Sequence, residues 1–339
     1  SMAMTPMPTP PPLAVDKSKL DKTLYIYNWG DYLDQDLVKQ FTAQYGVQVQ
    51  QDSYGSNEEM IQKLVAGGGG YDIVVPSDYA VAQMVKKGLL DKIDFNNIPN
   101  YANIGEVYKH TYFDPNDQYS VPYFWGTTGI AYDSAHVSPA PDSWAVMFDP
   151  KYKGEIAMLD DEREVPGAAL KLLGYSLNTT DTNQLQQAEQ KLIEQKSLVK
   201  AYDATNLDNM KKGEVWLAQM YVGDAQRAAA ERPSVKYIIP KEGATLWQDN
   251  ISIPKGAPHK YTAEVFINFL LDAHNAAKNA DTVEYPTPNL AALPYINPAD
   301  LSNPILYPPS NIISKLERVR DLGDQTQLYT RLYEEVKNH

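Results

Sequence analysis

Near the start of the chain, a short continuous run of apolar residues is followed by apolar residues at helical spacing. Residues 24–28 form the apolar, β-prone run, and apolar residues then recur at helical spacing from 37 to 45. Asp34 is placed to cap this helix and Gly46 to end it. The pattern predicts a strand that leads directly into a helix.

The same alternation recurs along the first hundred residues. A second strand is predicted over 47–54, followed by a helix that Ser56 and Glu59 open with the spacing of a capping box. A third strand over 71–75 leads into a helix that ends near Gly88. Strands that alternate with helices are typical of parallel βαβ units, so the sequence predicts an α/β fold.

A long β-prone run over 120–133 separates this region from the rest of the chain, and we expect a strand there that leaves one domain and enters another. Length alone suggests about two domains. The remaining predicted elements are a short helix and a strand over 143–159, helices after Pro166 and over 182–196, a strand and helix over 215–231, strands over 235–240 and 245–256, a helix pair over 264–283, and helices over 310–323 and 324–337.

Composition narrows the class of ligand. The net charge of −13 argues against nucleic acid and anionic membranes as partners and favours a cationic ligand. The chain has no cysteine, and its five histidines lack metal-binding spacing, so we expect no cofactor and no metal site. No apolar run reaches the length of a membrane span. Residues 1–21 resemble a cloning scar and a proline-rich, disordered tether, without a signal sequence.

Candidate chemistry begins where the first strand meets its helix. Trp29, Asp31 and Tyr32 lie at this junction, the usual ligand position in an open α/β sheet. Two aromatic rings beside a carboxylate suit an organic cation, which gains roughly 0.5 to 2 kcal/mol over an aromatic face. The alternative is a Trp buried for packing and an Asp that caps the helix.

An acidic segment over 160–164 follows another predicted strand. Because Pro166 is tolerated only near the start of a helix, Asp161 and Glu164 are expected close to the amino end of that helix. They either bind a ligand or form a solvated acidic cap that the helix dipole favours.

Two later strands end in the same residue types. Tyr221 and Asp224 stand at a strand-to-helix junction, and Trp247 and Asp249 share one face of a strand because strand side chains alternate. Several strand ends therefore offer an aromatic ring, an acid or both.

Six segments occur together in a recognisable order: Trp29, VVPSDYAV, DDEREV, YVGDA, LWQDN and EYPTPNLAA. With these segments the chain, over residues 22–339, resembles the bacterial spermidine/putrescine-binding proteins, the receptors of polyamine ABC transporters. The resemblance implies a type II periplasmic-binding-protein fold, in which two α/β domains close on a polyamine. It implies discontinuous domains, one of residues 22–126 with 247–293 and one of 127–246 with 294–339.

The resemblance also assigns roles to individual residues. Aromatic walls of the site would be Trp29, Tyr32, Tyr79, Tyr221 and Trp247, with Ser77 as a polar contact. Carboxylates that accept the amines would be Asp31, Asp161, Glu164, Asp224 and Asp249. The expected protein is not an enzyme, is periplasmic or lipid-anchored, is a monomer, and delivers its ligand to permease subunits in the membrane.

The chain departs from the family pattern at two positions. Tyr221 stands where many relatives have Trp or Phe, and Val319 or Arg320 falls where some members place a polar ligand contact. Other hypotheses therefore stay open. These are a binding protein for another organic cation, such as a quaternary amine or amino acid derivative, a glycoside hydrolase that uses paired carboxylates, and a protein that only signals or scaffolds.

Overall fold

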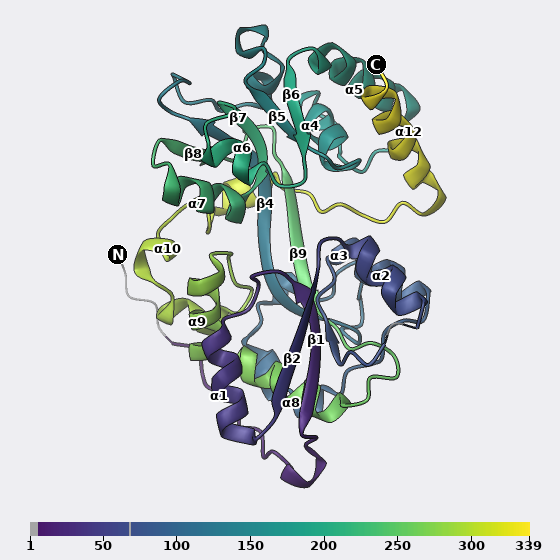
Figure 1. Ribbon diagram of the computed structural model, residues 1–339, viewed down its shortest axis with the longest axis vertical. Coiled ribbons are helices and arrows are strands. Elements are labelled where there is room, and N and C mark those ends of the chain that lie inside the picture. The colour runs from purple at the N-terminus through teal and green to yellow at the C-terminus, as the bar shows by residue number, and fades with distance from the viewer. Residues whose placement is uncertain (1–5, 68) are drawn as a thin grey trace. The chain divides into compact units, whose positions relative to one another are not determined.

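The computed structural model describes residues 6–67 and 69–339 and divides into two compact units. Unit 1 comprises Ser1–Trp125 and Gln248–Ser302, and unit 2 comprises Gly126–Trp247 and Asn303–His339. The chain thus passes between the units three times, within strand β4 (Val121–Asp133), within strand β9 (Thr245–Ile251), and after Ser302. Both strands are labelled in Figure 1. The third passage falls after Ser302 rather than after residue 293, where the sequence prediction placed it.

Unit 1 begins with the predicted alternation of strands and helices. Its elements are β1 (Thr23–Trp29), α1 (Gln35–Tyr45), β2 (Gln48–Tyr54), α2 (Asn57–Val65), β3 (Ile73–Val74) and α3 (Asp78–Lys86). The strands pair in the order β2-β1-β3, and both pairings of β1 are parallel. The parallel βαβ prediction is confirmed for this region.

The helix ends of unit 1 follow the predicted caps. The Asp34 carboxylate accepts the N–H of Leu37, and Gly46 ends α1 with a left-handed φ of 69°. The Ser56 hydroxyl accepts the N–H of Glu59 at the start of α2. The Glu59 carboxylate accepts the N–H of Gly55, so the capping box is displaced by one residue.

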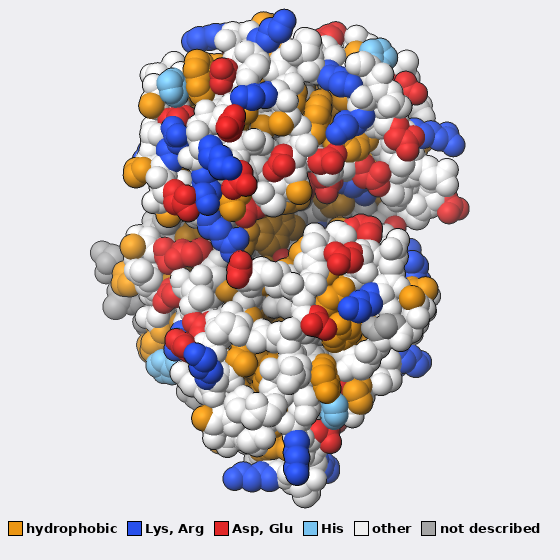
Figure 2. All heavy atoms as spheres, in the orientation of Figure 1, with side chains coloured by type: hydrophobic (Ala, Val, Ile, Leu, Met, Phe, Trp, Pro, Cys, Tyr) orange, Lys and Arg blue, Asp and Glu red, His pale blue; other side chains and the backbone are white. Residues whose placement is uncertain are grey.

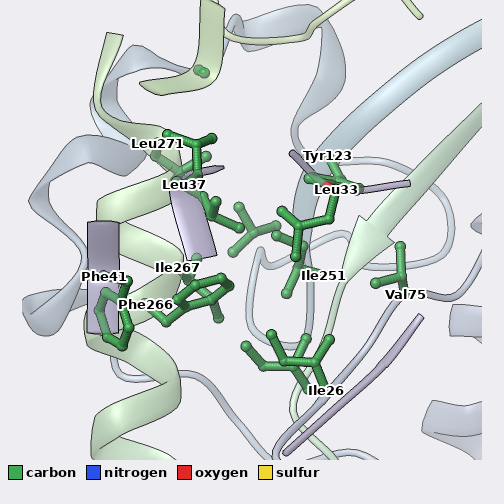
Figure 3. Packing of buried hydrophobic residues seen from close by; sticks show 14 of the residues in the cluster. Ile26, Leu33, Leu37, Phe41, Val75, Tyr123, Ile251, Phe266, Ile267 and Leu271 are labelled. Carbon is green, nitrogen blue, oxygen red and sulfur yellow. The ribbon is translucent and has the colours of Figure 1, made fainter. Parts of the chain in front are cut away.

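Helices α8 (Lys260–Leu271) and α9 (Ala273–Val283) complete the hydrophobic core of unit 1. Figure 3 shows Phe41 of α1 beside Phe266 of α8, with Leu37 and Leu271 in the same cluster. The rings of Phe41 and Phe266 meet edge to face, with centroids 4.9 Å apart. Residues far apart in the sequence therefore build one core. The shorter helices of unit 1 are η1 (Lys17–Lys19), η2 (Phe95–Asn97), η3 (Pro99–Asn103), η4 (Glu106–Tyr108), η7 (Leu290–Tyr295) and α10 (Pro298–Leu301).

The amino-terminal segment differs from the disordered tether that the sequence suggested. Residues 1–5 lie outside the described residues. Leu13, Val15 and Leu20 pack against the core of unit 1, and the Asp16 N–H donates to the Tyr261 hydroxyl at 2.9 Å. Burial of these apolar side chains stabilises the ordered segment. The prediction of disorder is based on the proline content and does not take these side chains into account.

Unit 2 is built on a mixed sheet with the strand order β6-β5-β7-β4-β8, and β9 pairs with β4. β5 runs parallel to β6 and β7, whereas β4 is antiparallel to β7 and β8. Its elements are η5 (Trp144–Phe148), η6 (Pro150–Tyr152), β5 (Ile156–Leu159), α4 (Glu164–Leu172), α5 (Thr182–Lys196), β6 (Val199–Asp203), α6 (Leu207–Lys211), β7 (Leu217–Tyr221), α7 (Val222–Glu231), β8 (Val235–Ile238), α11 (Ser310–Ile313), η8 (Gly323–Gln325) and α12 (Thr326–Lys337). Helix α12 packs beside α5, as Figure 1 shows.

The helix predicted over 310–323 is wrong beyond Ile313, where α11 ends. The chain instead becomes extended, because Glu317 donates its N–H to Ala244 and accepts the N–H of Leu246. The Glu317 carboxylate also pairs with the ammonium of Lys171 on α4. These long-range contacts outweigh the local helical spacing.

Candidate functional site

Asp249 of β9 is the most completely bonded of the predicted ligand carboxylates in unit 1. Its Oδ2 accepts the Tyr32 hydroxyl and its Oδ1 accepts the Ser77 hydroxyl, each at 2.7 Å. Only 8% of the residue is exposed, and this burial raises the pKa of Asp249 to about 6, although both hydroxyls oppose the shift. The structure thus brings together Tyr32, Ser77 and Asp249, three of the residues predicted to bind ligand, and that role stays a prediction.

The Tyr32 ring is fixed by its neighbours in unit 1. It lies 5.3 Å from the ring of Tyr123 and 5.4 Å from that of Phe124. Burial, together with the charge of Asp249, raises the pKa of Tyr32 well above its ordinary value. Tyr32 therefore stays neutral and acts as a hydrogen-bond donor to Asp249.

Trp29 and Asp31 have different surroundings, although only Gly30 separates them. The Trp29 indole N–H donates to the carbonyl of Val75 at 2.8 Å, and its ring lies 4.8 Å from that of Tyr54. Asp31 is exposed and has a left-handed φ of 52°. The Trp29 ring is thus held firmly, whereas Asp31 lies on a turn and is not joined to the hydroxyls that hold Asp249.

Tyr79 lies on α3 and is half-buried. Its hydroxyl accepts the side-chain amide of Asn57 at 3.0 Å and donates to the Glu58 carboxylate at 3.1 Å. Asn57 was not predicted from the sequence, where it is one polar residue in a helix-capping segment. Its side-chain contacts connect Tyr79 with Ser77.

Glu164 is the first residue of α4 in unit 2, and only 7% of it is exposed. The Thr245 hydroxyl donates to its Oε2 at 3.0 Å. Burial, aided by the nearby charge of Asp161, raises the pKa of Glu164 to about 8. A solvated acidic cap is therefore the wrong description of Glu164, because the side chain is buried. Thr245, which the sequence analysis did not identify, is its hydrogen-bond partner.

Asp161 has the capping role that the alternative hypothesis described. Its Oδ1 accepts the N–H of Arg163 at 2.8 Å and of Glu164 at 2.9 Å. Such contacts satisfy backbone donors at the start of α4. The other oxygen of a half-buried carboxylate can still accept a hydrogen bond, so capping and ligand binding are compatible in Asp161.

Asp224 lies in the first turn of α7 and is buried. Burial raises the pKa of Asp224 to about 6, and the charge of Arg227 opposes this shift. The closest guanidinium nitrogen of Arg227 is 3.7 Å from Asp224 Oδ1. The positive charge of Arg227 therefore offsets only part of the cost of burying an ionised Asp224.

Tyr221 and Trp247 form an aromatic pair in unit 2, with ring centroids 6.3 Å apart and an interplanar angle of 86°. The Trp247 ring lies directly on Gly126. A methyl group added to Gly126 would stand 2.3 Å from Cζ2 of Trp247. The glycine at this position therefore provides the space that the indole occupies.

Arg320, in the last segment of unit 2, is held by hydrogen bonds of its backbone. Its N–H donates to Asn178 Oδ1 at 2.8 Å, and its carbonyl accepts Arg163 Nη1 at 2.8 Å. The Arg163 guanidinium also lies over the ring of Tyr329. Arg163 and Arg320 thus belong to one structural cluster that ties the last segment to α4.

Three of the predicted ligand carboxylates, Asp249 in unit 1 and Glu164 and Asp224 in unit 2, are buried and have raised pKa values. Such groups gain most from a bound positive charge, which would restore their ionised forms. In residues 6–67 and 69–339 no group of three or more His, Asp or Glu side chains is arranged to hold a metal ion. Figure 2 shows acidic and basic side chains interspersed over unit 2, a pattern of ordinary solvated surface.

The stability of the ligand-free protein is expected to fall as the pH rises from about 4 to about 8. Asp249, Asp224 and Glu164 have folded-state pKa values of about 6, 6 and 8, above their ordinary values of 3.8, 3.8 and 4.5. The folded state therefore keeps protons that the unfolded state has already released. This contribution is fully present below the unfolded pKa and is lost as the pH passes the folded pKa.

Urea unfolding at several pH values between 4 and 8 measures this dependence. The variant Asp224→Asn/Glu164→Gln should show a flatter dependence than the unmodified protein. An equally steep fall in the variant would contradict the assignment of the effect to these carboxylates.

Comparisons with known proteins agree with this architecture. Residues 36–306 match a family model described as "Bacterial extracellular solute-binding protein". The chain is 40% identical to the spermidine/putrescine-binding periplasmic protein of Salmonella typhimurium, over 93% of this chain and 91% of that protein. It is 34% identical to the putrescine/cadaverine-binding protein of Pseudomonas aeruginosa, over 93% of each.

Solved structures with the same fold include the spermidine/putrescine ABC transporter substrate-binding protein PotD of Streptococcus pneumoniae. It is 36% identical, with a TM-score of 0.88 over 94% of this chain and 99% of that chain. The TpPotD lipoprotein of Treponema pallidum is 33% identical, with a TM-score of 0.81 over 94% of this chain and all of that one. The prediction of a type II periplasmic-binding-protein fold is confirmed, and the chain belongs to the bacterial extracellular solute-binding proteins.

Proposed function

We propose that this protein captures a linear polyamine, spermidine or putrescine or both, outside the cytoplasm and delivers it to an ABC permease. The observation that carries the proposal is the Asp249 carboxylate. It is buried, and the partners that hold it are the hydroxyls of Tyr32 and Ser77 rather than an ammonium or a guanidinium group. Such a carboxylate is suited to accept a protonated amine.

In this proposal the residues of each unit would contact one part of a polyamine. In unit 1 the ammonium would be accepted by Asp249, with Asp31 as a further acceptor and the rings of Trp29, Tyr32 and Tyr79 beside the methylenes. In unit 2 the acceptors would be Asp161, Glu164 and Asp224, with the rings of Tyr221 and Trp247. A hydrogen bond to a charged group contributes roughly 1.5 to 3 kcal/mol, and an aromatic face adds roughly 0.5 to 2. Domain closure on the ligand stays a prediction.

Location and partners follow from the relatives. Several are named as periplasmic proteins and one as a lipoprotein, so we infer that this protein works in the periplasm or anchored by lipid at the outer face of a membrane. None of the helices formed by the described residues is long and apolar enough to cross a membrane. A substrate-binding protein of this kind would meet the permease subunits of an ABC transporter as its partner.

A second candidate function is binding of a different organic cation. It is favoured by a relative of Pseudomonas aeruginosa that is named a putrescine/agmatine-binding protein and is 30% identical over 93% of this chain. A hydrolase is less consistent with the geometry, because Asp161 uses one oxygen to cap α4 and the relatives are named as binding proteins. We therefore propose no enzymatic role.

Isothermal titration of the purified protein, freed of ligand by mild unfolding and refolding, tests the proposal. Putrescine, cadaverine, spermidine, spermine, agmatine and choline are titrated at two salt concentrations. We expect one-to-one binding of at least one linear polyamine and weaker binding at the higher salt, because the contacts are between charges. Binding of agmatine or choline alone would favour the second candidate, and silence with every amine would contradict both.

A further inference from the structure

Asn57 contacts two hydroxyl groups of unit 1, those of Ser77 and Tyr79, and each of these hydroxyls contacts a carboxylate. It is the first residue of α2, and only 4% of it is exposed. The capping of α2 is done by its neighbour Ser56, which accepts the N–H of Glu59. The side chain of Asn57 is therefore available for contacts other than capping.

The orientation of the Asn57 amide is determined by a backbone donor. Its Oδ1 accepts the N–H of Ser77 at 3.1 Å, and a backbone N–H can only donate. The amide nitrogen must therefore be the atom that faces the Ser77 hydroxyl at 3.1 Å and the Tyr79 hydroxyl at 3.0 Å. Both of its protons are used in these two contacts.

These contacts also determine where the two hydroxyl protons point. The Ser77 oxygen accepts from Asn57, so its own proton is directed to Asp249 Oδ1 at 2.7 Å. In the same way the Tyr79 proton is directed to Glu58 Oε1 at 3.1 Å. Each hydroxyl thus accepts a hydrogen bond from the Asn57 amide and donates one to a carboxylate.

We propose that Asn57 is a positioning residue that directs the Ser77 proton onto Asp249 and thereby keeps Asp249 in the ionised form that accepts a ligand ammonium. The inference rests on the proposed function, because it gives Asp249 the role of ligand acceptor. If Asp249 were protonated on Oδ1, this proton would point at the Ser77 oxygen, which already accepts from Asn57. The Ser77 hydroxyl could then no longer donate to Oδ1, and its own proton would lose its acceptor. The arrangement thus favours the carboxylate over the carboxylic acid.

The other titratable groups that face Asp249 are phenols. Tyr32 donates to it directly, and the charge of Asp249 raises the pKa values of Tyr54 on β2 and of Tyr123 on β4. Burial is the larger cause of the raised pKa in both. Because these phenols stay neutral near pH 6, the titration of Asp249 in this range depends on burial and on its two hydroxyl donors.

The experiment follows the carboxyl carbon of Asp249 by NMR during a pH titration of the ligand-free protein. The resonance is assigned by its loss in Asp249→Asn. In Asn57→Leu the Ser77 hydroxyl is free to accept from a protonated Asp249. We expect the titration midpoint to rise by about half a pH unit or more. In a parallel calorimetric titration, the pH at which putrescine affinity falls by half should rise with it.

Asn103→Leu is the matched control. Asn103 is also buried in unit 1, and its side-chain amide donates to the carbonyl of Leu271. Its replacement removes a buried amide without touching Ser77, so the midpoint of Asp249 should stay unchanged. A structural role for Asn57 alone would lower stability in both variants and move the midpoint in neither.

Asn57→Ala decides the matter if Asn57→Leu does not fold. Alanine removes the amide donor to Ser77 without adding a charge, so the midpoint should rise again. An unchanged midpoint in the folded variants would overturn the proposal. The NMR titration contains no ligand, so it separates this inference from the proposed function, which fails only if no polyamine binds.

Discussion

Asp249→Asn is expected to weaken polyamine binding at least tenfold, which corresponds to roughly 1.4 kcal/mol. The asparagine keeps the size of the side chain, but its single amide oxygen can accept only one of the Tyr32 and Ser77 hydroxyls, and it carries no charge for the ammonium. Because the pKa of Asp249 is about 6, binding to the unmodified protein should weaken as the pH falls through 6. The variant should lose this part of the pH dependence.

Calorimetric titration with spermidine and putrescine at about pH 5 and about pH 7.5 measures both effects. Asp36→Asn is the matched control, because Asp36 is an exposed carboxylate of α1 that lies 3.6 Å from Lys278. The control removes the same charge from unit 1 and should change the affinity less than twofold. Equal affinities of Asp249→Asn and the unmodified protein would place the ligand elsewhere.

Gly126→Ala is expected to weaken binding by a similar factor through Trp247. The added methyl group would stand 2.3 Å from Cζ2 of the indole, closer than any real contact, so the ring must move. The aromatic face proposed to cover the ligand methylenes would then be displaced. Trp247→Ala, which removes that face entirely, should also weaken binding at least tenfold.

The control for this variant is Gly167→Ala in α4 of the same unit. The methyl group there would meet Cβ of Leu177 at 3.6 Å, an ordinary contact, and alanine favours the helix. Calorimetry and thermal unfolding of the three variants separate affinity from stability. Unchanged affinity in Gly126→Ala with a folded protein would show that the position of the Trp247 ring does not matter for binding.

The sequence predicted those parts of the fold that depend on local signals. The carboxylate of Asp34 and the left-handed φ of Gly46 bound α1 as expected, since a cap and a terminator act within one turn. The parallel pairing of β1 with β2 and β3 followed from the alternation of strand and helix. The caps and the apolar spacing that support these predictions each lie within a short stretch of the sequence.

Features that depend on distant residues could not be predicted in this way. The apolar residues after Ser310 have helical spacing, but the backbone of Glu317 pairs with Ala244 and Leu246 instead. Contacts such as these are made by residues with no fixed spacing in the sequence. The helix expected over 310–323 therefore ends at Ile313.

The candidate site shows the same division. Its residue types at strand ends could be read from the sequence, but their protonation could not. The raised pKa of Glu164 depends on burial and on Asp161, and its hydroxyl partner Thr245 is 81 positions away. Asp249 takes its two donors from 172 and 217 positions away. The role that we propose for Asn57 arises only when all of these segments have folded.

The division of each unit between separate segments has a consequence for the order in which the cores can form. Phe41 of unit 1 packs on Phe266, which follows the first segment of unit 2 in the sequence. The core of unit 1 therefore stays incomplete until that whole segment and α8 have been synthesised. The core of unit 2 includes Tyr329, Leu332 and Val336 in the last helix. Contacts over such long separations form slowly, because the loops between them must close first. During synthesis, the core of unit 1 therefore cannot be completed before α8 is made, and the core of unit 2 cannot be completed before the last helix is made.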